Sequence, residues 1–310
     1  MKTRVLSVMT CVMAAVSVAS ADSVRGIDIR FVTIGASGNL GDYRTDSITT
    51  DLGTTWWYAN PRGCGSVGYS YRIGKYEITV NQWETINNTA QIDNTTLGSG
   101  NQPVYGVSWY DAAQFCNYLT SGDKNLGAYQ IGTDGGITIN RQSAISTYGT
   151  LYVLPTENEW YKAAYYTGSG YSLYANGTDK APGLDVESNY AWEGSNYGSY
   201  ALPWGVGTGA IEQNGTFDMM GNVWEWTEAL HGFGDYRCHR GGAAIYDTYD
   251  LGEIYIPSSI FRGGDEPYYE NTGFVGFRVV EVPVIPAPSA LALVGIGVGF
   301  VGWLRRRKAV

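Results

Sequence analysis

The sequence predicts a mixed α+β fold with few helices and many loops. The chain of 310 residues contains 42 glycines, 25 tyrosines and 10 tryptophans, and only 16% of its residues are charged. Glycines permit tight turns and aromatic side chains fill the space between them, which is typical of an irregular, loop-rich fold. Short helix-capping signals and apolar strand patterns recur along the chain. The length allows one large domain or two small ones, with a substantial core.

The N-terminus has the pattern of a secretory signal peptide, predicted over residues 1–21. Two basic residues precede an apolar run over 5–18, and the Ala-Ser-Ala sequence at 19–21 is a small-residue cleavage site. The alternative is an N-terminal helix of the domain, but the run is short and ends in the cleavage pattern. We therefore expect an exported domain over residues 22–282.

The C-terminus is predicted to be a membrane-targeting segment. A proline-rich spacer over 283–288 precedes an apolar run over 289–304, slightly short of the roughly 20 residues of a spanning helix, and a basic cluster at 305–308. This arrangement resembles the PEP-CTERM sorting signal of exported bacterial proteins, although its Pro-Ala-Pro sequence lacks the usual central Glu. The resemblance implies an anchor with a basic tail over 289–310, an exosortase-type processing enzyme as partner, and a final place at the cell surface or in the extracellular matrix. A plain membrane anchor is the alternative.

The charge balance excludes some partners. The formal net charge is −9, and the exported part is more acidic because basic residues are concentrated in the two terminal segments. An acidic surface argues against binding to nucleic acid or to anionic lipid.

Strands and helices are predicted from periodicity and capping. Residues 27–34, 71–79 and 274–280 have strand patterns. Three helices are predicted to begin after hydroxyl caps, namely Thr79 with Gln82, Ser108, and Thr156 with Glu159. We expect 122–152 to be a surface hairpin or loop and 165–215 to be an open, Tyr- and Gly-rich segment.

The segment 215–226 is the most distinctive in the chain, because it combines two acids, glycines and two indoles. Asp218 and Glu225 are hard oxygen ligands seven residues apart, and Gly221 between them permits a turn that directs carbonyls inward. The pattern predicts a calcium cradle. The alternative is that both carboxylates only form hydrogen bonds with the turn.

Five blocks of sequence resemble the sulfatase-modifying factor family, whose best-known members are formylglycine-generating enzymes. They are YRIGKYEIT at 71–79, PVYGVSW at 103–109, LPTENEW at 154–160, GNVWEW at 221–226 with RGG at 240–242, and GFR at 276–278. The resemblance covers roughly residues 27–282 and implies a mixed fold similar to that of C-type lectins. In this resemblance Arg278 is expected to form a structural ion pair. Activity is a separate question from fold.

The resemblance also implies ligand sets for metals. It places a calcium ion at four positions: Asp218, Gly221, Val223 and Glu225. A second calcium site would use Asn189 and the carbonyl of Tyr190, but Gly198 stands where an acid is expected.

The catalytic positions of the family differ in this chain. Formylglycine-generating enzymes bind copper through a cysteine pair downstream of the Arg-Gly-Gly block. Tyr246 and Leu251 occupy those two positions here, and Ala243 replaces a serine. Copper(I) requires soft thiolates, which neither residue supplies. We therefore expect calcium but no copper.

Two further arrangements involve the histidines and the cysteines. The related sulfoxide synthases bind iron through histidines, and a cluster of His231, Asp235 and His239 is conceivable, although the glycines nearby argue against one helical face. Of the cysteines that remain after signal removal, Cys116 is expected to be a small buried side chain, whereas Cys64 and Cys238 are candidates for a disulfide.

The sequence thus predicts an exported, calcium-stabilised, non-catalytic domain that acts as a surface binding module for a glycan, peptide or matrix partner. The alternatives are a metal-dependent oxidase with a relocated or divergent site, and a structural protein of the extracellular matrix.

Overall fold

The computed structural model describes residues 21–44, 48–49, 55–56, 62–90, 92, 97–183, 186–189, 202–232, 234–244, 258–268 and 274–282. The predicted signal peptide up to residue 20, the proline-rich spacer and the predicted anchor lie outside these residues, as do Tyr190, Tyr246 and Leu251. Within the described parts of the chain, no helix is both long enough and apolar enough to cross a membrane.

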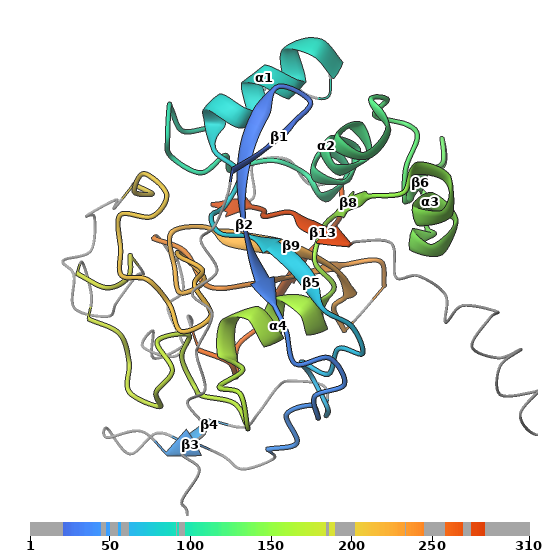
Figure 1. Ribbon diagram of the computed structural model, residues 1–310. Helices are drawn as coiled ribbons and strands as arrows, with labels where there is room; N and C mark the ends of the chain where they lie inside the picture. Colours follow the sequence, from blue (N-terminus) through green and yellow to red (C-terminus); the bar gives the residue numbers. More distant parts are fainter. Residues whose placement is uncertain are drawn as a thin grey trace, which may run out of the picture.

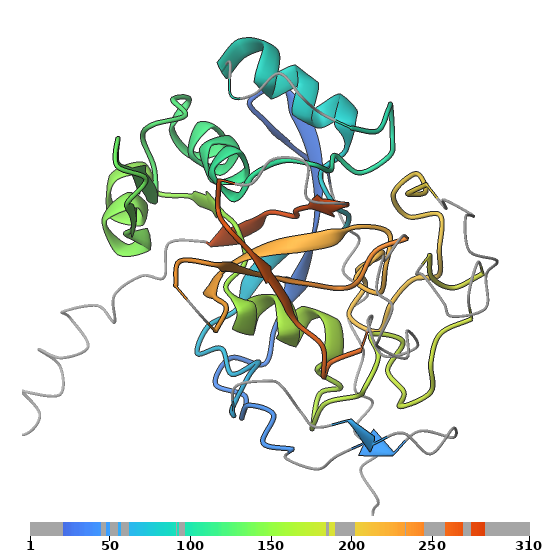
Figure 2. The ribbon, with the colours of Figure 1, turned by 180° about the vertical axis from the view of Figure 1, so that it is seen from behind.

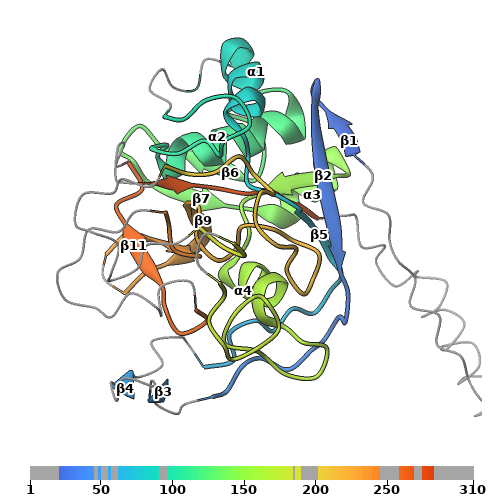
Figure 3. The same cartoon turned by 90° about the vertical axis from the view of Figure 1, so that its left-hand side faces the viewer.

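A five-stranded sheet brings the two ends of the domain together. Its order is β1 (Ala21–Val24), β2 (Ile27–Ile34), β5 (Tyr71–Gly74), β13 (Val280–Val282) and β8 (Leu151–Val153). All neighbouring strands are antiparallel. The last described strand, β13, lies between β5 and β8 and pairs with both, so the C-terminal end of the domain is built into the sheet that begins with β1. Figure 3 shows the β1–β2 hairpin at the edge of the molecule.

A second, four-stranded sheet has the order β11 (Gly263–Asp265), β10 (Arg237–Arg240), β9 (Trp224–Leu230) and β12 (Val275–Gly276). The pairing of β9 with β12 is parallel, and the other pairings are antiparallel. Two small hairpins complete the strands: β3 (Ile48–Thr49) with β4 (Thr55–Trp56), and β6 (Tyr129–Ile131) with β7 (Ile137–Ile139).

The helices are α1 (Val80–Ala90), α2 (Trp109–Ser121), α3 (Arg141–Tyr148) and α4 (Glu157–Tyr165). In Figures 1 and 2, α1 and α2 lie on one side of the central strands and α4 lies on the other. The hydroxyls of Thr79, Ser108 and Thr156 cap α1, α2 and α4 as predicted. Each cap satisfies a backbone N–H that the helix itself leaves without a partner.

The core between α1, α2 and the last strands is aromatic. The rings of Trp83 and Phe115 stack at 5.4 Å, and the ring of Phe277 meets both edge-on at 6.1 and 5.3 Å. All three side chains are fully buried, so their apolar area contributes its full hydrophobic stabilisation. This cluster fixes the segment that leads to Arg278.

The predicted α+β fold is confirmed, with differences in detail. The strand at 27–34 is confirmed, whereas the one predicted over 71–79 is shorter and ends at Gly74. The N–H groups of Gly74 and Lys75 still donate to the carbonyls of Val279 and Arg30 at the end of this strand. The predicted last strand is two short strands, β12 and β13. Residues 122–152 do contain a hairpin, but also the helix α3, which the sequence analysis missed.

Candidate functional site

The segment 215–226 forms an irregular turn that leads into β9. Asp218, Gly221 and Asn222 have φ values of 63°, 109° and 64°, in the left-handed region that favours glycine and tolerates asparagine and aspartate. The N–H of Gly221 donates to the Gly241 carbonyl at 2.8 Å, and the N–H of Asn222 donates to the Asn189 carbonyl at 2.6 Å. Contacts to distant segments therefore hold this backbone in shape.

The carboxylate of Glu225 is paired with Arg278 in the interior. Nη2 and Nε of Arg278 lie 2.5 and 2.6 Å from the two Glu225 oxygens, and the Trp160 indole donates to Oε2 at 2.7 Å. Both side chains of the ion pair are fully buried. Burial opposes the guanidinium charge, yet the Glu225 charge holds the pKa of Arg278 above its ordinary value. The predicted structural ion pair of Arg278 is confirmed.

Glu77 faces the same turn, although the sequence analysis did not assign it to this site. Its oxygens accept from Asn222 Nδ2 at 2.8 Å and from the Val223 N–H at 3.2 Å. Burial raises the pKa of Glu77 well above its ordinary value, and the charges of Asp218 and Glu225 raise it further. The signal was present in the Tyr-Glu-Ile-Thr block, but nothing local connects that block to a turn 145 residues away.

Two further acids complete the acidic surroundings of the turn. Glu212 accepts from Thr216 Oγ1 at 2.8 Å and from the Met219 N–H at 2.9 Å, and burial raises its pKa to about 8. Asp218 accepts from the Gly207 N–H at 2.6 Å, and burial raises its pKa to about 6. The carboxyl groups around the turn therefore outnumber the buried guanidinium of Arg278, which balances the charge of only one of them.

The donor chemistry of this turn fits a hard cation in part. Carboxylate and carbonyl oxygens are the ligands that calcium prefers, and the pKa values of Glu77, Glu212 and Asp218 are raised because burial leaves negative charge uncompensated. Both oxygens of Glu225, however, accept from Arg278 in this arrangement. Over the described ranges, no three His, Cys, Asp or Glu side chains form a metal-holding group. A calcium ion here would therefore depend on Asp218 and on main-chain carbonyls such as those of residues 221 and 223.

Asn189 lies against the same turn. Its Nδ2 donates to the Leu202 carbonyl at 3.2 Å and to Asn222 Oδ1 at 3.4 Å, while its own carbonyl accepts from the Asn222 N–H. Tyr190 and Gly198, the other positions of the expected second calcium site, lie outside the described residues.

The Arg-Gly-Gly block packs directly behind the turn. Arg240 is fully buried, and its Nη2 and Nε lie 2.5 and 2.9 Å from Glu157 Oε1. The Ala244 N–H donates to the Asn222 carbonyl at 2.9 Å. This block therefore anchors α4 to the turn. The positions of the family's copper-binding pair, Tyr246 and Leu251, follow it but lie outside the described residues.

The conceivable cluster of His231, Asp235 and His239 is not assembled. His239 lies on β10, where its Nε2 is 3.0 Å from Oδ2 of Asp265 on β11, not of Asp235. The histidines lie on and near strands, so the regular spacing by four does not bring them to one face. Residues Gly263 and Gly264 are needed on β11, since an added Cβ would lie 2.1 Å from the His239 ring and 2.4 Å from His231.

The three cysteines in the described parts of the chain are free and buried. Cys64 and Cys238 are not joined, so the candidate disulfide is wrong for this structure. Burial raises the pKa of Cys64 to about 12 and that of Cys238 to about 11. The Cys238 thiol instead points at Glu157 Oε1, 3.5 Å away. Such thiols are almost wholly protonated at neutral pH, which makes them poor nucleophiles and poor metal ligands. Cys116 is fully buried on α2, as predicted.

Comparisons with known proteins agree with this arrangement. The chain is 28% identical over 226 residues to the chaperone protein LppX of Paenibacillus barcinonensis, covering 64% of this chain and 77% of that protein. It is 45% identical over 83 residues to the formylglycine-generating enzyme of Mycobacterium tuberculosis strain H37Rv, covering 24% of this chain and 26% of the enzyme.

Solved structures show the same fold. Treponema denticola variable protein 1 superposes with a TM-score of 0.57 at 20% identity, covering 85% of this chain and 98% of that one. CarF superposes with a TM-score of 0.57 at 23% identity, covering 83% and 98%. The structure of PvdO from Pseudomonas aeruginosa gives a TM-score of 0.54 at 15% identity, covering 82% and 94%.

A family model described as the sulfatase-modifying factor enzyme 1-like domain matches residues 60–282. This range contains all five blocks in full and the turn at 215–226, with the Glu225–Arg278 pair that holds it. The chain therefore belongs to the family of sulfatase-modifying factor enzyme 1-like domains.

Proposed function

We propose that this protein is an exported, calcium-stabilised member of its family that acts as a non-catalytic surface binding module. The observation that carries the proposal is the residue pair Tyr246 and Leu251, which occupies the positions of the copper-binding cysteines in the resemblance to formylglycine-generating enzymes. A phenol and an aliphatic side chain cannot replace thiolates as copper(I) ligands.

The remaining thiols support the same conclusion. Cys64, Cys116 and Cys238 are buried, and burial raises the pKa of each thiol above its ordinary value. Protonated thiols of this kind are poor ligands for copper(I) at neutral pH. A relocated oxidase site would have to be built from other residues.

Calcium is proposed to stabilise the turn at 215–226. Asp218 would supply carboxylate oxygen and the carbonyls of Gly221 and Val223 would supply further ligands. Glu225, the fourth proposed ligand, would join them by sharing its carboxylate between the ion and Arg278. A second ion would use Asn189 and the carbonyl of Tyr190, and the amide nitrogen of Asn189 is bonded to Asn222 Oδ1. The ion would supply positive charge to the acidic interior, and the protein would gain stability rather than reactivity.

Binding is proposed as the role of the exposed loops. Several apolar side chains stand out from the surface, among them Leu40 at 81%, Val186 at 76% and Ile211 at 62% exposure. Exposed apolar groups on loops held by a rigid scaffold are typical of recognition surfaces for a glycan, a peptide or a matrix component. One relative of this chain carries the name of a chaperone.

Export is proposed to bring the module to its place of action. The segment over 1–21 would direct secretion, and 289–310 would anchor the chain until an exosortase-type enzyme processes it. The mass of the mature protein recovered from the cell surface would test this, because an intact C-terminus would exclude processing.

An oxidase assay tests the non-catalytic role. A cysteine-containing sulfatase peptide is incubated with the purified protein, oxygen and copper(I), and the formylglycine product is sought by mass spectrometry. We expect no product, with an active formylglycine-generating enzyme as the positive control. Conversion by this protein would contradict the proposal and favour the alternative, a divergent oxidase, to which the 45% identical segment shared with an enzyme points.

A further inference from the structure

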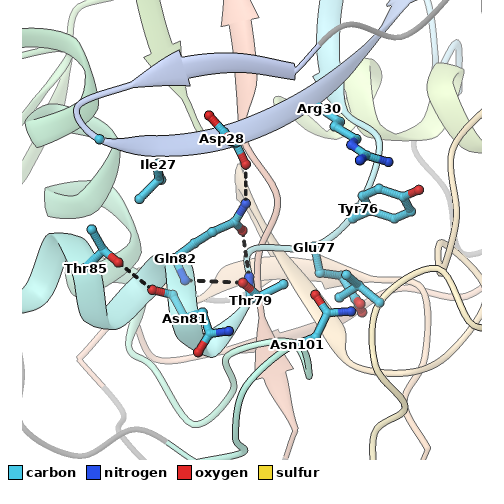
Figure 4. Close-up of a pocket in the computed structure, with 12 residues that line it drawn as sticks. Ile27, Asp28, Arg30, Tyr76, Glu77, Thr79, Asn81, Gln82, Thr85 and Asn101 are labelled. Carbon is cyan, nitrogen blue, oxygen red and sulfur yellow. Dashed lines mark hydrogen bonds between the residues drawn. The ribbon is translucent and has the colours of Figure 1, made fainter.

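A polar hollow lies beside the turn, between β2 and the beginning of α1 (Figure 4). Its volume is about 570 Å³, within the range of small-molecule sites in proteins. The lining comes from four segments far apart in the sequence: the β1–β2 hairpin, the residues before and within α1, Asn101, and the loop at Val206. Nearly all of the side chains that line it are polar.

Several of these polar groups have unused hydrogen-bonding capacity. No described residue forms a hydrogen bond or an ion pair with the side chains of Asp28, Arg30, Asn81 or Asn101, or with the Tyr76 hydroxyl. In Figure 4 Asp28 and Arg30 lie along β2 on one side of Gln82 and Thr79, and Asn81 and Asn101 lie on the other side. Two amides, a carboxylate, a guanidinium and a phenol together offer both donors and acceptors.

The walls of the hollow are fixed. Gln82 Nε2 donates to the Asp28 carbonyl at 2.7 Å, while its Oε1 accepts from the Thr79 N–H at 2.9 Å. The Val206 N–H donates to the Asn101 carbonyl at 2.9 Å. These bonds tie the hairpin, α1 and the loop together, so a ligand would meet a site that is already formed, which reduces the entropic cost of binding.

The Gly207 backbone provides a second constraint. Its N–H donates to Asp218 at 2.6 Å, and an added Cβ at this position would lie 2.5 Å from the Tyr76 ring. Tyr76 therefore packs against bare backbone, and the tyrosine, the loop and the turn hold one another in place.

The charges indicate a neutral ligand. Asp28 and Arg30 lie two positions apart on the exposed face of β2 and balance each other in charge. Glu77, the other acid of the lining, is buried and accepts from Asn222 and from the Val223 N–H. The N–H groups of Val80 and Asn81 at the start of α1 already donate to the carbonyls of Gln102 and Gly100, so they do not form an anion site. A peptide ligand would need apolar subsites, and the lining offers few. A ligand rich in hydroxyls, each both donor and acceptor, matches the lining best.

We propose that this hollow is a saccharide site, which binds a neutral mono- or disaccharide unit of a glycan through Asn81, Asn101, Asp28, Arg30 and the Tyr76 hydroxyl. This assignment rests on the proposed binding function and specifies the class of ligand that the module binds. Asn81 and Asn101 fix the sugar by paired donor and acceptor contacts, and the two charged side chains strengthen those contacts because charge-assisted hydrogen bonds are stronger than neutral ones.

Saturation-transfer NMR on the purified full-length protein tests the proposal, with cellobiose, maltose, lactose and N,N′-diacetylchitobiose as probes. We expect saturation transfer to at least one disaccharide. Because the ligand is neutral, the transfer signal at about 0.5 M salt should be about as strong as the signal at low salt. Loss of one amide contact weakens the affinity by up to about tenfold. The double variant Asn81→Ala with Asn101→Ala loses two such contacts, so its affinity should fall by about tenfold or more.

Asn88→Ala is the matched control, because Asn88 is an exposed asparagine on the same helix that does not line the hollow. It should leave binding unchanged, and an unchanged melting temperature should show that both proteins are folded. Three results would overturn the proposal: no transfer to any disaccharide, equal transfer in the double variant and the wild type, or binding that high salt abolishes. If no sugar binds and the oxidase assay is negative, only the saccharide site fails; formylglycine formation would instead overturn the binding-module role.

Discussion

Glu225 and Arg278 form a fully buried ion pair that joins the turn at 215–226 to the end of the domain. The two residues are 53 positions apart, and the same guanidinium also donates to the carbonyls of Gly74 and Phe217 at 3.0 and 2.9 Å. One side chain thus connects β5, the turn and the last strands. A buried charge pair with all its donors satisfied specifies geometry more than it adds stability.

Replacing Arg278 by Met should destabilise the domain by roughly 3–5 kcal/mol, because it leaves the Glu225 charge buried without its partner. Adding Glu225→Gln to Arg278→Met should recover part of the loss. Urea unfolding of the single and double variants measures both effects. Arg62→Met, at an exposed position, is the control. A loss below about 1 kcal/mol for Arg278→Met, as is typical of a surface ion pair, would contradict the structural role of Arg278.

Glu212 should make stability depend on pH. Burial raises its pKa to about 8 from an ordinary 4.5, so the folded state binds a proton that the unfolded state has lost between these values. The stabilisation is complete below pH 4.5 and is lost as the pH rises through 8, with a slope of at most about 1.4 kcal/mol per pH unit. Glu212→Gln, which stays neutral, should flatten this decline in thermal melts from pH 5 to 8. An unchanged slope in the variant would show that Glu212 is ionised in the folded protein.

Gly276 should not tolerate a side chain. A Cβ there would lie 2.3 Å from the Val104 carbonyl oxygen, which is backbone and cannot move aside. Gly276→Ala should therefore cost about 1–3 kcal/mol or more. Gly35→Ala is the matched control, because no atom lies within 4 Å of its added Cβ. It should be neutral or stabilise by roughly 0.4–1 kcal/mol. Equal denaturation midpoints for the two variants would be incompatible with the close approach of β12 to residue 104.

The thiols of Cys64 and Cys238 should resist alkylation. Their raised pKa values, about 12 and about 11, leave little thiolate at pH 8, and burial excludes the reagent. Iodoacetamide should modify neither residue in the native protein and both after unfolding, as followed by intact mass. A mass lower by two protons before any reduction, with protection that persists in urea, would indicate a disulfide and contradict the free thiols.

Local signals made much of the fold predictable. The caps at Thr79, Ser108 and Thr156 depend on residues three positions away, so the sequence contains the whole interaction. The strand at 27–34 is visible from its alternation, which the structure reproduces. Helix α3 escaped prediction because Ala144 is its one buried residue, so it has no apolar face for periodicity to detect.

The site was less predictable because its contacts are long-range. Glu77 reaches Asn222 across 145 positions, and Asn189 reaches it across 33. No local pattern indicates such contacts. The seven-residue spacing of Asp218 and Glu225 was visible, and an ion pair of Arg278 was expected, but no local pattern indicated that its partner would be Glu225. The hollow beside β2 escaped prediction for the same reason, since its lining comes from four separate segments.

Elemental analysis of the purified protein by inductively coupled plasma mass spectrometry, covering calcium, copper, iron and zinc, is the decisive measurement. We expect calcium at about one ion per chain and no stoichiometric redox metal, because oxygen ligands gather at the turn and thiolates are absent from the copper positions. Asp218→Asn should lower the calcium content, whereas Asp235→Asn should not. Stoichiometric copper or iron, or a calcium-free protein whose melting temperature is unaffected by added calcium, would contradict a calcium-stabilised binding module.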